Sequence, residues 1–88
     1  MTDNKEKIYT LIEDSMCHQW YVVPVEDVYE SGVYDRISLY SPQRNGKIYL
    51  EENFDFNMFY NAMIDKGYDV SANKRISITS FEEFLKTV

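Results

Sequence analysis

The chain has 88 residues, a formal net charge of −6 and a sequence pI of about 4.6. A chain of this length forms one domain, and an apolar fraction of 44% with 3 Gly and 2 Pro argues against disorder. Its acidity argues against direct binding to nucleic acid or to an anionic membrane, because like charges repel. We therefore expect a single domain over residues 1–88 that meets a basic partner.

The first predicted element is a helix from Asp3 to Met16. Asp3 and Glu6 have the spacing of an N-cap and its reciprocal partner. Apolar residues recur at helical spacing at Ile8, Leu11, Ile12 and Met16. The aromatic and β-branched run Gln19–Val23 then predicts a strand that Pro24 ends, and Val25–Gly32 is expected to be a loop.

Two further strands are predicted at Val33–Tyr40 and Lys47–Glu51. Asn45-Gly46 lies between them and is typical of a tight hairpin turn, because both residues tolerate positive φ. Alternation along these strands places a set of tyrosines beside Arg36 on one sheet face. The set is Tyr34, Tyr40 and Tyr49. This face is either an exposed binding surface or is covered by the last helix or by Trp20 and Tyr21.

The last part of the chain predicts two helices. Asn53 or Asp55 caps the first, which Gly67 ends, and its apolar stripe is Phe56, Phe59, Tyr60, Met63 and Ile64. Residues 68–75 are expected to form a loop and Ile76–Ile78 a short strand. Ser80 and Glu83 form a capping box before a final helix. The predicted fold is α+β, in the order α-β-β-β-α-(β)-α, with a three-stranded antiparallel sheet and helices packed on one face.

No motif for catalysis or metal binding is present. Cys17 and His18 are unique in the chain, but adjacent residues do not face each other in a strand or in a helix. A zinc site needs about four N or S ligands, and isolated glycines cannot form a phosphate-binding loop. The pattern predicts no enzyme activity, no cofactor and no metal.

The acidic residues are concentrated near the start of the chain. Residues 1–35 hold eight acids and two bases, whereas residues 36–88 hold seven of each. Such asymmetry indicates a directed electrostatic surface, although acidity can also serve only solubility. The candidate partner-binding acids are Glu13, Asp14, Glu26, Asp27, Glu30 and Asp35, with an extension over Glu51, Glu52 and Asp55. The candidate hot spots are Tyr34, Tyr40 and Tyr49, because tyrosine is enriched there.

The segment Asn45–Glu52, leading into the helix at Phe56, resembles the corresponding part of small acidic phage-encoded anti-CRISPR inhibitors of type II-A effectors. The resemblance also extends to length, acidity and predicted layout. It implies an inhibitor that mimics the DNA motif read by an effector nuclease. In that family the hairpin and inter-helix loops carry key acids, whereas Gln43, Arg44, Lys74 and Arg75 stand here. This departure moves the expected contact surface to the acids named above.

Together these patterns predict an acidic inhibitor that blocks a basic nucleic-acid-binding site on a protein or nuclease by DNA mimicry. The alternative is a non-enzymatic assembly or regulatory module that docks or self-associates through the tyrosine face. Either protein would be a monomer or a homodimer. Met1 leads into charged residues, no apolar stretch reaches the roughly 18–20 residues of a membrane span, and Cys17 cannot form an internal disulfide. We expect a cytoplasmic protein, in the host cytoplasm if it is phage-encoded.

Overall fold

A five-stranded mixed sheet organises the fold, and the computed structural model describes residues 5–88. The strands are β1 (Glu6–Glu13), β2 (Gln19–Pro24), β3 (Gln43–Arg44), β4 (Lys47–Glu51) and β5 (Asp69–Ser77). Their order across the sheet is β3-β4-β2-β1-β5, and only β1 and β5 pair in parallel. The α+β class is confirmed, whereas the predicted three-stranded antiparallel sheet and its element order are wrong.

The first element is the strand β1, which lies between β2 and the edge strand β5, and not the predicted helix. Leu11 and Ile12 are adjacent and point to opposite faces, yet both are buried, because both sheet faces are covered at this position. A strand buried on both faces reads as a continuous apolar run, and over a few residues such a run also fits helical spacing. The predicted cap at Asp3 lies outside the described residues.

Two segments after β2 also differ from expectation. The predicted loop at Val25–Gly32 is the helix α1 (Val25–Ser31), which ends at Gly32 with φ 84°. The predicted strand at Val33–Tyr40 is instead a 3-10 turn, η1 (Tyr34–Arg36), followed by an irregular loop. Glycine is favoured at a left-handed C-terminal position because it has no Cβ, so Gly32 is a helix-stop signal that the prediction read only as a turn.

The turn at Asn45-Gly46 and the predicted strands at Gln19–Val23 and Lys47–Glu51 are confirmed, although the hairpin's first strand is β3 and not Val33–Tyr40. Asn45 (φ 52°) and Gly46 (φ 77°) connect β3 to β4, both in the positive-φ conformation expected of a two-residue hairpin turn. β2 and β4 pair in antiparallel register from Trp20–Glu51 to Pro24–Lys47. This register fixes which side chains of the two strands share a face.

The next helix begins with a wide π turn, η2 (Glu52–Phe56), and continues as α2 (Asn57–Asp65). Gly67 follows with φ 91°, which confirms the predicted helix stop. The chain then forms β5, so the predicted loop at residues 68–75 is wrong and the predicted short strand at 76–78 is part of a longer one. β5 was not recognised because seven of its nine side chains are exposed and carry no alternating pattern.

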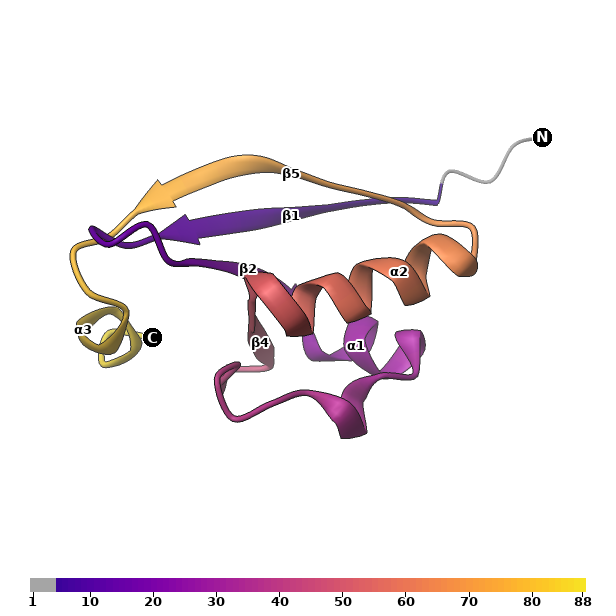
Figure 1. Cartoon of the computed structure of the whole chain (residues 1–88), viewed down its shortest axis with the longest axis horizontal. Helices are drawn as coiled ribbons and strands as arrows, with labels where there is room; N and C mark the ends of the chain where they lie inside the picture. Colours follow the sequence, from indigo (N-terminus) through magenta and orange to yellow (C-terminus); the bar gives the residue numbers. More distant parts are fainter. Residues whose placement is uncertain (1–4) are drawn as a thin grey trace.

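The main core lies between one sheet face and the helices α1 and α2. Its residues with 2% exposure or less are Val23, Val28, Val33, Ile48, Leu50, Phe59 and Met63, and Tyr9 completes the cluster. The Tyr9 ring meets the Phe59 ring edge-on at 5.8 Å between centroids. Figure 1 shows α1 and α2 together on one side of β1 and β5.

The last helix, α3 (Phe81–Leu85), packs on the opposite sheet face. Trp20 and Tyr49 point away from the main core, because their strand neighbours Tyr21 and Leu50 point into it. Phe81 of α3 contacts both Trp20 and Tyr49. The prediction that all helices pack on one face is therefore wrong, and Figure 1 shows α3 apart from α1 and α2, beyond the end of β5.

Candidate functional site

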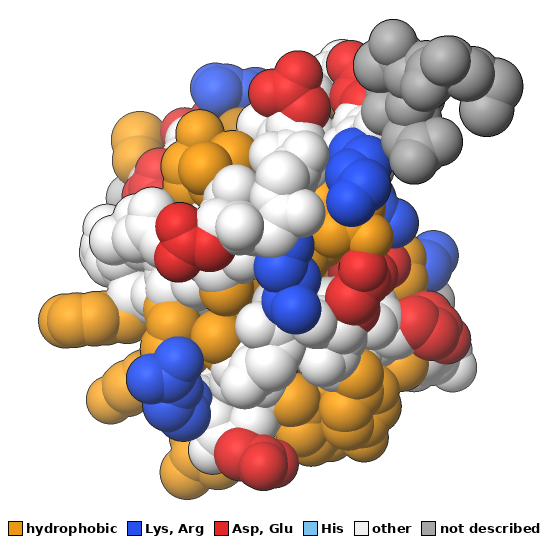
Figure 2. Space-filling model, turned by 90° about the vertical axis from the view of Figure 1, so that its right-hand side faces the viewer, with side chains coloured by type: hydrophobic (Ala, Val, Ile, Leu, Met, Phe, Trp, Pro, Cys, Tyr) orange, Lys and Arg blue, Asp and Glu red, His pale blue; other side chains and the backbone are white. Residues whose placement is uncertain are grey.

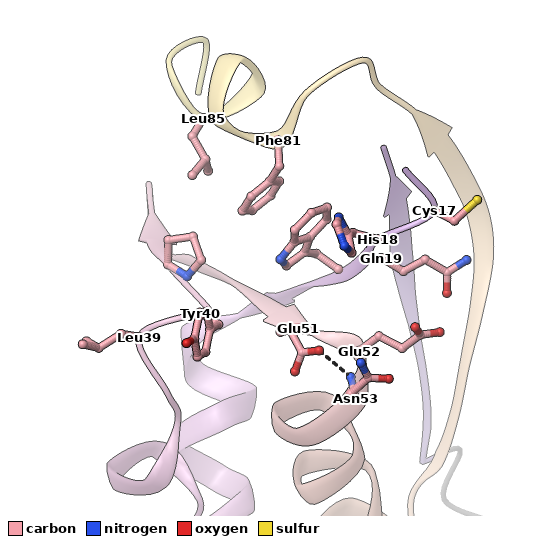
Figure 3. A pocket seen from close by; sticks show the side chains of 12 residues that line it. Cys17, His18, Gln19, Leu39, Tyr40, Glu51, Glu52, Asn53, Phe81 and Leu85 are labelled. Carbon is pink, nitrogen blue, oxygen red and sulfur yellow. Dashed lines mark hydrogen bonds between the residues drawn. The ribbon is translucent and has the colours of Figure 1, made fainter. Parts of the chain in front are cut away.

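A pocket of about 560 Å³ lies beside α3, on the face opposite the main core. Four segments line it: the start of β2, the loop before β3, the β4–η2 junction and α3. The lining residues are Cys17, His18, Gln19, Trp20, Leu39, Tyr40, Pro42, Glu51, Glu52, Asn53, Phe81 and Leu85. Figure 3 shows Phe81 and Leu85 reaching in from α3, with Tyr40 on the facing side.

Stacked aromatic rings form one wall of the pocket. The Trp20 and Phe81 rings lie 3.7 Å apart between centroids and 6° from parallel. On the sheet beneath α3, the Tyr49 ring meets the Phe81 and Phe84 rings edge-on, at 6.0 Å and 5.8 Å between centroids. Burial under α3 raises the pKa of Tyr49 above its ordinary value. Ser80 caps α3 by accepting the Glu83 backbone N–H at 3.4 Å, which confirms the Ser80 half of the predicted capping box, whereas the Glu83 carboxylate pairs with Lys86.

A buried carboxylate fixes the facing wall. Asp55 is 2% exposed, and its Oδ2 accepts hydrogen bonds from the Ser38 N–H (3.1 Å), the Ser38 hydroxyl (2.6 Å) and the Ser41 hydroxyl (2.5 Å). Ser41 Oγ in turn accepts the Glu51 N–H of β4 at 2.8 Å. The loop of residues 38–41 is thereby tied both to η2 and to the sheet, although it contains no regular strand. We call this set of hydrogen bonds the Asp55 latch.

The latch holds apolar side chains out in solvent. Leu39 is 100% exposed and Tyr40 79%, and Phe54, beside Asp55 on the π turn, is 82% exposed. The wide turn places Phe54 outward and Asp55 inward. Single exposed apolar residues are ordinary on protein surfaces. Three of them on two segments joined by a buried hydrogen-bond network, next to an apolar pocket, indicate a binding surface.

The polar rim of the pocket is acidic. None of the described residues that line it is Lys or Arg, and two are glutamates. The Glu51 carboxylate caps the π turn by accepting the N–H groups of Asn53 (2.9 Å) and Phe54 (3.0 Å), and Figure 3 marks the first of these bonds. Glu52 is exposed, and within residues 5–88 its carboxylate has neither a hydrogen bond nor an ion pair. Glu52 is therefore the carboxylate of the pocket that is free to meet a cation.

The acids predicted on α1 lie at the other end of β2 and are largely paired. Asp27 accepts the Tyr9 hydroxyl at 2.7 Å and lies 3.5 Å from Lys7 Nζ. Glu30 accepts the Tyr68 hydroxyl, and the ammonium groups of both Lys5 and Lys7 lie over the Tyr68 ring. Figure 2 looks at this end of the molecule and shows Lys and Arg side chains among the carboxylates. The predicted acidic residues of α1 therefore share this end of the molecule with basic side chains.

The remaining predicted acids are dispersed. Glu13 at the end of β1 pairs with Arg75 at 3.2 Å, and Asp35 lies on the 3-10 turn η1. Asp14 accepts the N–H groups of Met16 and His18, both at 2.9 Å. Desolvation alone would raise the pKa of Asp14. The two backbone bonds and the His18 ring together lower it by more, so the pKa lies below its usual value.

The three predicted tyrosines do not share a sheet face. Tyr34 stacks on Tyr29 and donates its hydroxyl to Gln43 Oε1 at 3.2 Å. Tyr49 is 5% exposed because α3 covers it, which is the covered alternative that the sequence left open. Tyr40 is the one of the three that lines the pocket, together with Glu51 and Glu52 from the extended acidic set.

Sequence reasoning missed the pocket residues Trp20, Phe81 and Leu39 and the role of Asp55. Trp20 and Phe81 were assigned to a strand and a helix, and only the packing of α3 on the sheet brings them together. The Ser38–Asp55 contact joins positions 17 residues apart across an unpredicted loop, so no local pattern signals it.

Cys17 and His18 both line the pocket, but their side chains do not face each other. In residues 5–88, no group of three or more His, Cys, Asp and Glu side chains could hold a metal ion. His18 Nδ1 faces Asp14 Oδ2 at 3.3 Å, and Figure 3 shows the Cys17 side chain pointing away from His18. What remains is an apolar cavity with a free carboxylate, which are features that recognise a ligand.

The described part of the chain contains no helix with both the length and the apolar character needed to cross a membrane. Comparison with protein-family models, with curated proteins and with solved structures finds no match for this chain.

Proposed function

We propose that this protein is a non-enzymatic acidic inhibitor that docks on a basic site of a nucleic-acid-handling protein and blocks it. The observation that carries the proposal is the pocket, whose apolar walls bear a free Glu52 and whose described lining has no Lys or Arg. A net charge of −6 would steer the protein toward a basic surface and away from nucleic acid itself. An inhibitor of the anti-CRISPR kind is one protein of this class.

The proposal does not rest on the layout that suggested the anti-CRISPR resemblance. A first helix followed by three antiparallel strands is not the arrangement of this chain. Broad mimicry of a DNA backbone would need an array of free carboxylates, and Glu13, Asp14, Asp27 and Glu30 are held by internal partners. Local acidic contacts around an apolar anchor fit the geometry better than a long phosphate-like array.

The test is capture on the immobilised protein, followed by a functional assay. Wild type, Glu52→Lys and the control Glu26→Lys are compared, since Glu26 is an exposed acid on α1. We expect wild type and the Glu26 variant to retain a nucleic-acid-binding protein that heparin or salt elutes, and Glu52→Lys to lose it. Adding the free protein should then abolish DNA or RNA binding by the captured partner. Undiminished nucleic-acid binding at saturating inhibitor contradicts the proposal.

Self-association is the second candidate, and the fully exposed Leu39 beside an apolar pocket favours it. Each copy carries a charge of −6, so two copies repel each other at low salt. Sedimentation equilibrium distinguishes the two candidates. A dimer that strengthens with salt and is lost in Leu39→Ser supports an assembly role, whereas a monomer at all concentrations refutes it.

A further inference from the structure

We propose that the pocket binds one large apolar side chain, such as Leu, Met or Phe, from a partner segment whose neighbouring residues are Lys or Arg. The inference rests on the proposed function and deepens it by naming the chemistry of the docking segment. It follows from three features of the pocket: its size and walls, its rim, and its rigidity.

The walls select an apolar group. A volume of about 560 Å³ accommodates one large side chain together with part of its backbone. The stacked Trp20–Phe81 pair offers a flat apolar surface, and Leu85 closes the same side. A polar side chain placed against these rings would lose its hydrogen bonds to water without replacement.

The rim selects a cation beside that group. Glu52 is exposed and unpaired within residues 5–88, whereas Glu51 already caps two backbone N–H groups. A Lys or Arg one or two residues from the anchor would pair with Glu52 while its stem covers the apolar edge. An acidic segment, including a second copy of this chain, would meet repulsion there.

The Asp55 latch makes the pocket rigid before binding. Three hydrogen bonds to one buried carboxylate oxygen fix Ser38 and Ser41, and therefore the position of Leu39 between them. Ordering a loop on binding costs free energy, so a loop already held in place lowers the cost of association. This is the physical reason for a buried Asp that has no Lys or Arg partner in the described chain.

The probes are synthetic eight-residue peptides, and Trp20 is the reporter. Trp20 is the only tryptophan of the chain and lines the pocket, so its fluorescence reports occupancy when the peptides contain no aromatic residue. The first peptide combines Lys, Arg and Gly with one central Leu. The second replaces that Leu with Ser, and the third keeps Leu but replaces each Lys and Arg with Glu. Titrations follow fluorescence and heat.

We expect the Leu peptide to bind about tenfold or more tightly than the Ser peptide, because burial of a Leu side chain separates them. The Glu peptide should not bind. Glu52→Gln should weaken the Leu peptide several-fold and reduce its salt dependence, and Leu39→Ser should weaken it without changing the fold, since Leu39 is fully exposed. The matched control Asp65→Asn, at an exposed acid of α2 outside the pocket, should bind as wild type does.

Equal affinity for the Leu and Ser peptides, or binding that leaves Trp20 fluorescence unchanged, would overturn the inference. So would a Trp20 signal that changes on dilution without peptide, because a second copy would then fill the pocket. The outcome is separable from that of the proposed function. If Leu39→Ser still retains a partner that heparin elutes, the proposed function stands and this site is refuted. If the Leu peptide binds in the pocket but no partner is inhibited, this site stands and the proposed function is refuted.

Discussion

The two faces of the sheet are built differently. The face under α1 and α2 is closed by side chains with almost no exposure, among them Val23, Leu50 and Phe59. On the other face Ile12 and Tyr49 are also buried, but the Trp20 and Phe81 rings at α3, a helix of five residues, are only half-buried. A helix this short cannot cover the whole face, so an apolar pocket stays open beside it. We therefore expect the first face to contribute more to stability, and the proposed binding site lies on the second.

The largest expected difference between the faces is in the free energy of unfolding after loss of one ring. Phe59→Ala should lower it by about 4 kcal/mol, because a fully buried aromatic side chain leaves a cavity. Phe81→Ala should cost about 1.5 kcal/mol, since half-buried rings lose less area. Urea denaturation followed by circular dichroism measures both, with the exposed Phe54→Ala as a control within about 0.5 kcal/mol of wild type. Equal losses at Phe59 and Phe81 would mean that α3 covers a second core.

The Asp55 latch ties η2 to the loop of residues 38–41 and to the sheet. We expect its removal to have the second-largest effect on the free energy of unfolding. Asp55→Ala should lower the free energy of unfolding by about 3 kcal/mol, because it leaves two hydroxyls and one N–H without their acceptor. Hydrogen exchange of the amides at residues 38–41 should rise in the same variant. The control is Asp65→Ala, an exposed acid on α2. If exchange rises equally across α2, the latch supports the whole fold and not the pocket wall alone.

The first face should also show a distinct dependence on alkaline pH. Burial, followed by the hydrogen bond to Asp27, raises the pKa of Tyr9 above its ordinary value of 10.0. Below pH 10 both folded and unfolded chains keep this proton, so the contribution is complete. Above pH 10 the unfolded phenol ionises while the folded one does not, and stability falls by about 1.4 kcal/mol per pH unit from this group.

Tyr9→Phe removes that part of the slope, and urea denaturation between pH 9 and pH 11.5 measures it. Burial under α3 raises the pKa of Tyr49 in the same direction, so Tyr49→Phe tests the second face in the same experiment. We expect the larger reduction of slope from Tyr9, because Tyr9 adds a hydrogen bond to a carboxylate. The exposed Tyr40→Phe is the control variant. A larger reduction of slope in Tyr49→Phe would contradict the expectation that Tyr9, on the first face, contributes more to the loss of stability at alkaline pH.

The smallest expected effect is at the cap of α3. Ser80→Ala removes the hydroxyl that accepts the Glu83 N–H and should cost about 1 kcal/mol. Because Trp20 stacks on Phe81 in the first turn of α3, its fluorescence should change as that turn loosens. Thr79→Ala, next to the cap and exposed, is the matched control. Unchanged fluorescence in a destabilised Ser80→Ala would show that Phe81 holds its place without the cap.

Parts of this fold were predictable because their signals are local. The turn at Asn45-Gly46, the helix stop at Gly67 and the Ser80 cap each act over a few residues, and the structure confirms them. The helix predicted from the apolar stripe is also present, but of that stripe Phe59 and Met63 are buried whereas Tyr60 and Ile64 are exposed. The strand β1 was read as a helix because burial on both faces removes the alternation that identifies a strand. β5 showed no pattern because it is an exposed edge strand.

The candidate site was predictable only in fragments. Tyr40, Glu51 and Glu52 were named from composition and charge, and they line the pocket. Their neighbours Trp20 and Phe81 come from elements whose pairing depends on long-range register. The acids of α1 were expected to form an exposed surface, but the side chains of Lys7 and Tyr9 on β1 reach Asp27, and Tyr68 just before β5 reaches Glu30. Charge counts along a sequence cannot show such pairing.

The parallel pairing of β1 with β5 has a consequence for the order of folding. Glu6 is in register with Asp69, and Glu13 with Ser77, so β1 pairs with residues more than sixty positions later in the chain. During synthesis, β1 can pair with β2 early, but its second edge stays open until most of the chain has emerged. Non-local pairing of this kind slows folding and leaves an unpaired strand edge exposed in the meantime. The open edge of β1 therefore stays available for non-native strand pairing until β5 has been synthesised.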